Sequence, residues 1–152
     1  MSELEHEIDD YLTRYAATLT HYDAQAAAEL WGTPGMILDD RFAGALDSRA
    51  KMAEGLTQSY PLYQKLGLAS VGYERLSLQQ LADTIYLVRV RWLFYDAEGV
   101  QLTDGTNNYI LRRDDDGLHA YVCIPTDEAQ KLQQLAEERG IDLAAEMGGA
   151  SD

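Results

Sequence analysis

The chain has 152 residues, of which 46% are hydrophobic and 25% charged, the composition of one ordinary globular domain. Its 12 basic and 26 acidic residues give a net charge of −14, which argues against a partner made of nucleic acid or of anionic membrane lipid. The single cysteine, Cys123, excludes an internal disulfide and a cysteine-rich zinc module.

The N-terminal residues are acidic and lack the basic segment and the apolar run of a secretory signal. The most apolar run, residues 85–95, contains Arg89 and Arg91 and is shorter than the roughly 18 apolar residues that cross a bilayer. We therefore expect no membrane association and a cytoplasmic location, with which a lone reduced thiol agrees.

The first part of the chain predicts helices. Ser2 followed by Glu5 forms a capping-box pattern, and apolar residues spaced by three and four continue a helix to about residue 20. Asp23 can cap a second helix through about residue 30. The turn-forming residues 32–35 then end that helix, and residues 36–39 predict a short strand.

A third helix and a group of strands follow. Ser48 can cap the helix, Pro61 should kink or restart it, and Gly67 should stop it. Four β-like runs come next, at about 68–79, 84–96, 100–113 and 118–124. Their connectors are too short for crossover helices, so we expect antiparallel neighbours in a meander.

The end of the chain predicts one more helix, at 127–139, with Thr126 as its cap. We expect a single domain over residues 1–139 and a flexible tail over 140–152. Helices followed by long antiparallel strands indicate an α+β fold, a sheet with helices on one side. Such long strands must curl, and the concave side of the sheet can then hold a cavity.

Three segments, in their order along the chain, carry a resemblance to a known family. They are Thr20-His21-Tyr22-Asp23, Met36-Ile37-Leu38-Asp39-Asp40, and the acidic hairpin Arg112-Arg113-Asp114-Asp115-Asp116-Gly117-Leu118. Over about residues 4–125 the chain resembles the SnoaL-like, or nuclear transport factor 2-like, superfamily. Many relatives have Gly where Tyr22 stands and Trp where Leu118 stands.

The resemblance implies a cone, in which three N-terminal helices pack in the concave side of a strongly curved antiparallel sheet; the C-terminal helix is an addition. It also implies a small apolar pocket and, often, a homodimer through the convex sheet face. The superfamily includes cyclases, isomerases, dehydratases, hydrolases, transport adaptors and association domains, so one chemistry does not follow. If there is catalysis, the resemblance points to acid/base work without a cofactor.

Alternation along residues 84–96 separates two faces of a strand. The face expected in the core carries Tyr86, Val88, Val90, Trp92 and Phe94. Arg89 and Arg91 then point to the convex side, toward solvent or a partner. The alternative is an anion site inside the cone, which would pair these arginines with Asp39 or Asp40.

The last strand is expected to turn Leu118, Ala120, Val122 and Ile124 into the core. His119 would then be a surface or interface residue rather than a general base. Cys123 lies on the same face as His119 and has no evident charged neighbour to activate its thiol. The histidines at 6, 21 and 119 meet no spacing rule for a metal site, and we expect none.

Aromatic residues predicted to point inward are Tyr15, Trp31, Tyr60, Tyr63 and Trp92. Bulky rings with a polar tip suit a ligand that is mostly apolar and carries an oxygen. Asn108 can add an amide if its face of the strand is concave. The alternative is that these rings simply fill the core.

Two functions follow as hypotheses. In the first, a homodimeric cone protein binds a small, mostly apolar molecule, with acid/base catalysis of the isomerase, dehydratase or cyclase type as a further possibility. Asp39 or Asp40 would then be the base, and Tyr63 or Tyr15 would donate a hydrogen bond to a developing oxyanion. In the second, the chain is a non-catalytic dimeric binding or association module whose cone is filled by side chains.

Overall fold

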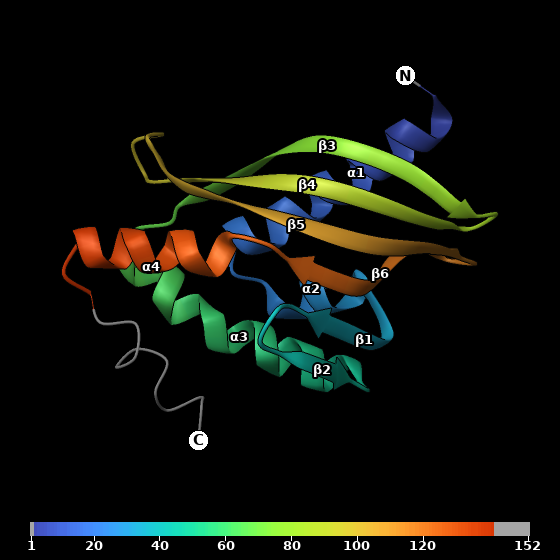
Figure 1. Cartoon of the computed structure of the whole chain (residues 1–152), viewed down its shortest axis with the longest axis horizontal. Coiled ribbons are helices and arrows are strands. Elements are labelled where there is room, and N and C mark those ends of the chain that lie inside the picture. The colour runs from blue at the N-terminus through green and yellow to red at the C-terminus, as the bar shows by residue number, and fades with distance from the viewer. Residues whose placement is uncertain (1, 142–152) are drawn as a thin grey trace.

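A computed structural model describes residues 2–141 and contains one six-stranded sheet in the order β2-β1-β6-β5-β4-β3 (Figure 1). In chain order the elements are α1 (Glu3–Thr20), α2 (Ala24–Glu29), β1 (Trp31–Leu38), β2 (Ala43–Leu46), α3 (Arg49–Lys65), β3 (Ser70–Ala82), β4 (Ile85–Tyr95), β5 (Gln101–Asp114), β6 (Gly117–Pro125) and α4 (Glu128–Glu138). Helices α1, α2 and α3 lie on one side of the curved sheet, and α4 lies at one end of it. The predicted α+β fold is confirmed.

The meander of β3, β4, β5 and β6 is antiparallel throughout, as their short connectors predict. Strand β1 extends this sheet by pairing with β6 in parallel and with β2 in antiparallel orientation. The long strands twist and arch over the helices (Figure 1), and the hydrophobic core lies between these helices and the concave face of the sheet.

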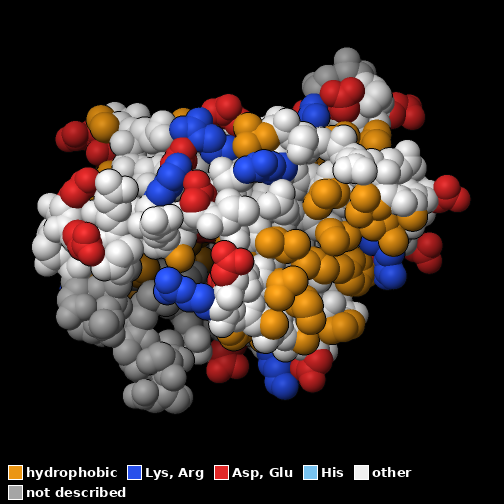
Figure 2. All heavy atoms as spheres, in the orientation of Figure 1, with side chains coloured by type: hydrophobic (Ala, Val, Ile, Leu, Met, Phe, Trp, Pro, Cys, Tyr) orange, Lys and Arg blue, Asp and Glu red, His pale blue; other side chains and the backbone are white. Residues whose placement is uncertain are grey.

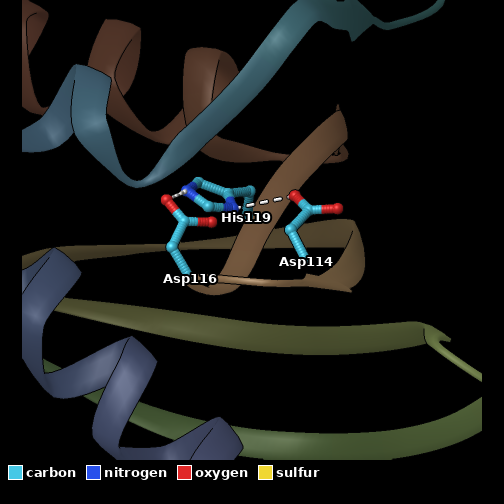
Figure 3. A group of neighbouring side chains, drawn as sticks. All are labelled: Asp114, Asp116 and His119. Carbon is cyan, nitrogen blue, oxygen red and sulfur yellow. Dashed lines mark hydrogen bonds and ion pairs between the residues drawn. The ribbon is translucent and has the colours of Figure 1, made fainter.

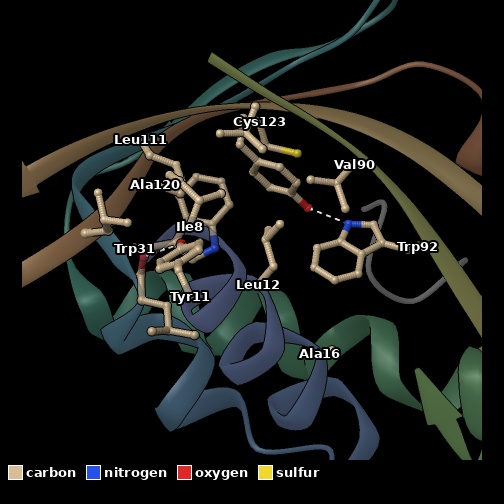
Figure 4. Packing of buried hydrophobic residues seen from close by; sticks show 14 of the residues in the cluster. Ile8, Tyr11, Leu12, Ala16, Trp31, Val90, Trp92, Leu111, Ala120 and Cys123 are labelled. Carbon is tan, nitrogen blue, oxygen red and sulfur yellow. Dashed lines mark hydrogen bonds between the residues drawn. The ribbon is translucent and has the colours of Figure 1, made fainter. Parts of the chain in front are cut away.

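Helix α1 begins as its capping box predicts, because the Ser2 hydroxyl accepts a hydrogen bond of 3.1 Å from the Glu5 backbone N–H. Its apolar stripe faces the sheet, with Ile8, Tyr11 and Leu12 at most 1% exposed. Figure 4 shows these side chains pointing from α1 toward Val90, Leu111 and Ala120 of the strands. This packing fixes α1 across the concave face.

Between α2 and α3 one prediction was wrong, and one strand was not predicted at all. Strand β1 begins at Trp31, whereas the sequence predicted a turn at 32–35 and a strand only at 36–39; the turn-forming residues instead form an irregularity in the pairing with β6. Strand β2 has the sequence Ala-Gly-Ala-Leu, which carries little strand propensity, and forms by pairing with β1. Pro61 was predicted to kink or restart the third helix; α3 runs through it to Lys65, so the helix does not restart there.

The two faces of β4 are as predicted, with every second residue from Tyr86 to Phe94 buried.

The prediction for β6 was partly wrong because its alternation is broken by a bulge. Ala120 pairs with Leu111 and Val122 with Ile110, so one residue of β6 has no partner between them. The bulge turns Cys123 into the core together with Ala120, and leaves Val122 only half-buried. His119, predicted to be a surface or interface residue, is buried within the chain itself, at 7% exposed.

The predicted flexible tail, 140–152, lies outside the described residues from residue 142 onward. Between residues 2 and 141, no helix combines the length and the apolar character that crossing a lipid bilayer requires.

Candidate functional site

A cavity of about 210 Å³ lies between the helices and the concave face of the sheet. Its wall is mainly apolar and is built from α1, α2, α3, α4 and five strands of the sheet, all except β2. For comparison, an apolar protein cavity of about 150 Å³ is large enough to hold benzene. The hollow therefore has room for a molecule somewhat larger than a single six-membered ring.

All five aromatic residues predicted to face inward lie in the wall of this cavity: Tyr15, Trp31, Tyr60, Tyr63 and Trp92. The Trp31 ring N–H donates a hydrogen bond of 2.9 Å to the Tyr15 hydroxyl, and the Tyr15 and Trp92 rings stack with centroids 5.6 Å apart. The Trp92 ring N–H donates to the Tyr109 hydroxyl at 2.9 Å, the bond drawn beside Trp92 in Figure 4. These bonds fix the ring orientations and leave a preformed aromatic wall.

One carboxyl group, that of Glu128, lies in this wall. Its Oε1 atom accepts a hydrogen bond of 2.9 Å from the Tyr63 hydroxyl, and its Oε2 atom accepts one of 3.2 Å from the Asn107 side-chain amide. The Asn107 amide also donates to the Tyr109 hydroxyl at 3.2 Å. The carboxyl group is therefore oriented by two donors from different elements, α3 and β5.

Burial shifts the pKa values of the groups around this carboxyl in one direction. Desolvation raises the pKa of Glu128, and the bonds from Tyr63 and Asn107 offset only part of the shift. Desolvation also raises the pKa of Tyr63 well above its ordinary value, and the neighbouring Glu128 carboxylate adds to that shift. The site thus favours a neutral tyrosine beside an acid that holds its proton more tightly than an exposed glutamate.

Helix α4 holds Glu128 in place by several contacts with β5 and α3. The Thr106 backbone N–H donates a hydrogen bond of 2.7 Å to the Asp127 carboxylate, immediately before Glu128. Further along the helix, Lys131 pairs with Asp104. Apolar side chains complete the contact: Leu132, Leu135 and Ala136 of α4 pack with Leu62 of α3 and with Leu66, the C-cap residue of α3. These contacts therefore fix the first turn of α4 against β5.

Three other predicted site residues, Asp39, Asp40 and Asn108, lie outside the cavity. Asp39 and Asp40 lie in the turn between β1 and β2, and neither lines the cavity. The Asp39 carboxylate instead accepts a hydrogen bond of 2.8 Å from the Arg41 backbone N–H. Asn108 belongs to the opposite face of β5, and its neighbour Asn107 supplies the amide. The proposed acid/base chemistry therefore cannot rest on the two aspartates.

Arg89 is exposed and Arg91 pairs with Glu74 at 2.7 Å on the outer face of the sheet, so neither forms an anion site inside the cone. Cys123 does line the cavity, because of the bulge in β6. Desolvation raises the pKa of its thiol to about 12, which keeps it protonated and unreactive as a nucleophile.

A second cluster of ionisable side chains closes the hairpin between β5 and β6 (Figure 3). Asp114, Asp116 and His119 offer ligand atoms within 4.8 Å of one another. The Asp114 carboxylate, however, already accepts hydrogen bonds from Tyr121 at 2.7 Å and Arg112 at 2.6 Å, and lies 2.8 Å from His119 Nδ1. We assign this cluster to the hairpin itself, whose turn the sequence predicts.

Sequence reasoning missed Glu128, Asn107 and Tyr109. Glu128 opens a helix whose apolar stripe gives no sign that its first residue faces the sheet. Asn107 and Tyr109 could have been found from the register of the β4–β5 hairpin. In that register Val88 pairs with Tyr109 and Val90 with Asn107, so the predicted core face of β4 continues onto the odd-numbered residues of β5.

Gly105 sets how closely α4 approaches the sheet. A Cβ atom at this position would lie 2.8 Å from Cβ and 3.2 Å from Cα of Glu128. We expect Gly105→Ala to displace the first turn of α4 and to lower the free energy of unfolding by roughly 1–3 kcal/mol. Urea denaturation measures this change.

The matched control is Gly55→Ala in the exposed part of α3, where the added Cβ atom meets only a Leu46 methyl group at 3.8 Å. Removing a helical glycine there should stabilise the protein by roughly 0.5–1 kcal/mol. If both substitutions changed the free energy of unfolding equally, the close approach of Glu128 to Gly105 would be contradicted.

The raised pKa of Glu128 predicts a pH-dependent stability. The folded protein holds this proton more tightly than the unfolded chain, so its stabilising contribution is complete below the ordinary glutamate value of 4.5 and is lost as pH rises through the folded pKa. Glu128→Gln cannot ionise, so the variant should gain in unfolding free energy relative to wild type as pH rises. Chemical denaturation from pH 4 to pH 9 tests this.

Glu138→Gln, at an exposed position of the same helix, provides the control. The difference in unfolding free energy between this variant and wild type should vary little over the same pH range. If the difference in unfolding free energy between Glu128→Gln and wild type varied as little with pH as that of the control, the Glu128 carboxyl would not be desolvated.

Comparison with known proteins places the chain in a family. The family model described as "NTF2-like protein (DUF6841)" matches residues 3–128, and no curated protein gives a significant match. A domain of unknown function with a cystatin-like fold from Nostoc punctiforme has a TM-score of 0.65 at 13% identity, over 99% of this chain and 95% of that one. An NTF-2-like protein of unknown function from Shewanella oneidensis has a TM-score of 0.63 at 14% identity, over 81% and 98%.

A ketosteroid isomerase-like protein from Erwinia carotovora atroseptica is also similar, with a TM-score of 0.61 at 16% identity, over 82% of this chain and 96% of that one. At such identities these structures show the fold alone. The family match, which extends from the start of α1 to Glu128 itself, confirms the resemblance drawn from the three sequence segments. The chain belongs to the NTF2-like protein family DUF6841.

Proposed function

We propose that this protein binds a small, mostly apolar molecule in the cavity between sheet and helices, and that Glu128 exchanges a proton with it. The observation that carries this proposal is the Glu128 carboxyl in the wall of an otherwise mainly apolar cavity, oriented by Tyr63 and Asn107. A carboxyl group in such surroundings is suited to general acid/base work near neutral pH.

Tyr15 is the better of the two predicted hydrogen-bond donors. The Tyr63 hydroxyl proton is directed to Glu128, whereas the Tyr15 hydroxyl accepts from the Trp31 ring N–H and so keeps its own proton for a polar atom of the ligand. Glu128 and Tyr15 would then act on a ligand held by the aromatic wall. Isomerisation, dehydration and cyclisation without a cofactor are the reaction classes that need only these groups.

The cavity gives a direct test, because both tryptophans of the chain, Trp31 and Trp92, lie in its wall. Their fluorescence therefore reports on the cavity without background from other tryptophans. We expect cyclohexanol, which does not absorb where tryptophan does, to change this fluorescence saturably. Ala16→Leu, which places three additional carbon atoms in the cavity wall, should weaken the binding by about tenfold or more.

Ala17→Leu is the matched control, because Ala17 is the next residue of α1 and is exposed outside the cavity. It should bind the probe as wild type does. No saturable change in wild type, or equal binding by both leucine variants, would contradict a ligand site in this cavity.

The predicted homodimer through the outer face of the sheet is a separate proposal. Apolar side chains gather on this face over β6, β1 and β2 (Figure 2), and Met36 and Leu38 of β1 are 38% and 39% exposed. Such a patch favours association with a second copy. We expect sedimentation equilibrium to give twice the chain mass for wild type and the chain mass for Leu38→Asp; a monomeric wild type would contradict the proposal.

A further inference from the structure

Charge in the cavity wall is of one sign. Glu128 is its one acid, and among the described residues that line the cavity none is Lys, Arg or His. The basic residues in and directly after the neighbouring α4 are engaged elsewhere: Lys131 pairs with Asp104, and Arg139, the C-cap residue, donates a hydrogen bond of 2.9 Å to the Leu66 carbonyl. A ligand that carries an anionic group would therefore meet a carboxyl group with no cation to offset it.

The Glu128 carboxylate has acceptor capacity left for a ligand. It receives one hydrogen bond at each oxygen, from Tyr63 and from Asn107. An ionised carboxylate offers about four lone-pair sites, so a further donor can be accommodated. A neutral hydroxyl can use such a site, but a protonated nitrogen gains a charge-assisted bond there, which is the stronger of the two.

The aromatic rings of the cavity wall also favour a cationic ligand. The rings that line the cavity are Tyr15, Trp31, Tyr60, Tyr63, Trp92, Phe94 and Tyr109. Faces of tryptophan and tyrosine rings attract ammonium groups, and this attraction is greatest where water is excluded. The net charge of −14 further raises the local concentration of cations around the protein.

Resting on the proposed function, we infer that the cavity ligand is a small organic amine, bound as an ammonium group against the Glu128 carboxylate and within the aromatic wall. The nitrogen is then the atom with which Glu128 exchanges its proton: the N–H bond breaks as the carboxyl O–H bond forms, and the reverse step restores the ammonium. No further reactant is needed for this exchange.

Three probes with the same six-membered ring test the inference: cyclohexylamine, cyclohexanol and cyclohexanecarboxylate. Titrations at pH 8 and physiological salt use the fluorescence of Trp31 and Trp92. We expect wild type to bind the amine about tenfold or more tightly than the alcohol, and the carboxylate most weakly. In Glu128→Gln the amine-to-alcohol ratio should fall toward one, because the amide keeps the shape of the side chain and removes its charge.

The outcomes separate the inference from the function on which it rests. If wild type binds the alcohol at least as tightly as the amine, or if Glu128→Gln leaves the ratio unchanged, the amine inference is overturned while the cavity remains a ligand site. If none of the three probes changes the fluorescence saturably, the proposed function itself is contradicted.

Discussion

The contact between the first turn of α4 and the middle of β5 is the constraint on which the site depends. It places a carboxyl group, delivered from the C-terminal helix, into a cavity that the rest of the fold lines with aromatic rings. Gly105 permits the approach, and Asp127 anchors it. Without this contact the same sheet and helices would enclose an almost entirely apolar hollow.

The fold supports the site through the length and curvature of its strands. A meander of long strands curls around α1 and α3 (Figure 1). The hydrogen-bonded pairs Trp31–Tyr15 and Trp92–Tyr109 fix the orientation of four of the rings that form the cavity wall. Each of these ring N–H and hydroxyl groups thereby has a hydrogen-bond partner without water. Among the buried side-chain nitrogen and oxygen atoms of the described residues, the one without a hydrogen bond is the Asn107 Oδ1 atom, in the same side chain that donates to the Glu128 carboxyl group.

Much of the fold follows from local signals in the sequence. The capping box at Ser2, the period of β4 and the short connectors predict α1, the core face and the antiparallel meander. The errors lie where local signals are weak or are overridden: β2 has few strand-forming residues, and the bulge in β6 reverses an alternation that sequence reasoning takes as continuous. The bulge brings Cys123 to the cavity and could not be read from the alternation of residues.

The aromatic wall was predictable, since the five rings lie at inward positions of helices and strands, but the carboxyl group was not. Sequence reasoning sought it at Asp39 and Asp40, close to the early strand, whereas tertiary packing supplies it from α4, some 90 residues later.

A carboxyl-carbon NMR titration of the ¹³C-labelled protein, with Glu128→Gln to assign the resonance, directly tests whether the pKa of Glu128 is raised. The account predicts a midpoint above the ordinary glutamate value of 4.5, and a midpoint at or below that value would contradict it.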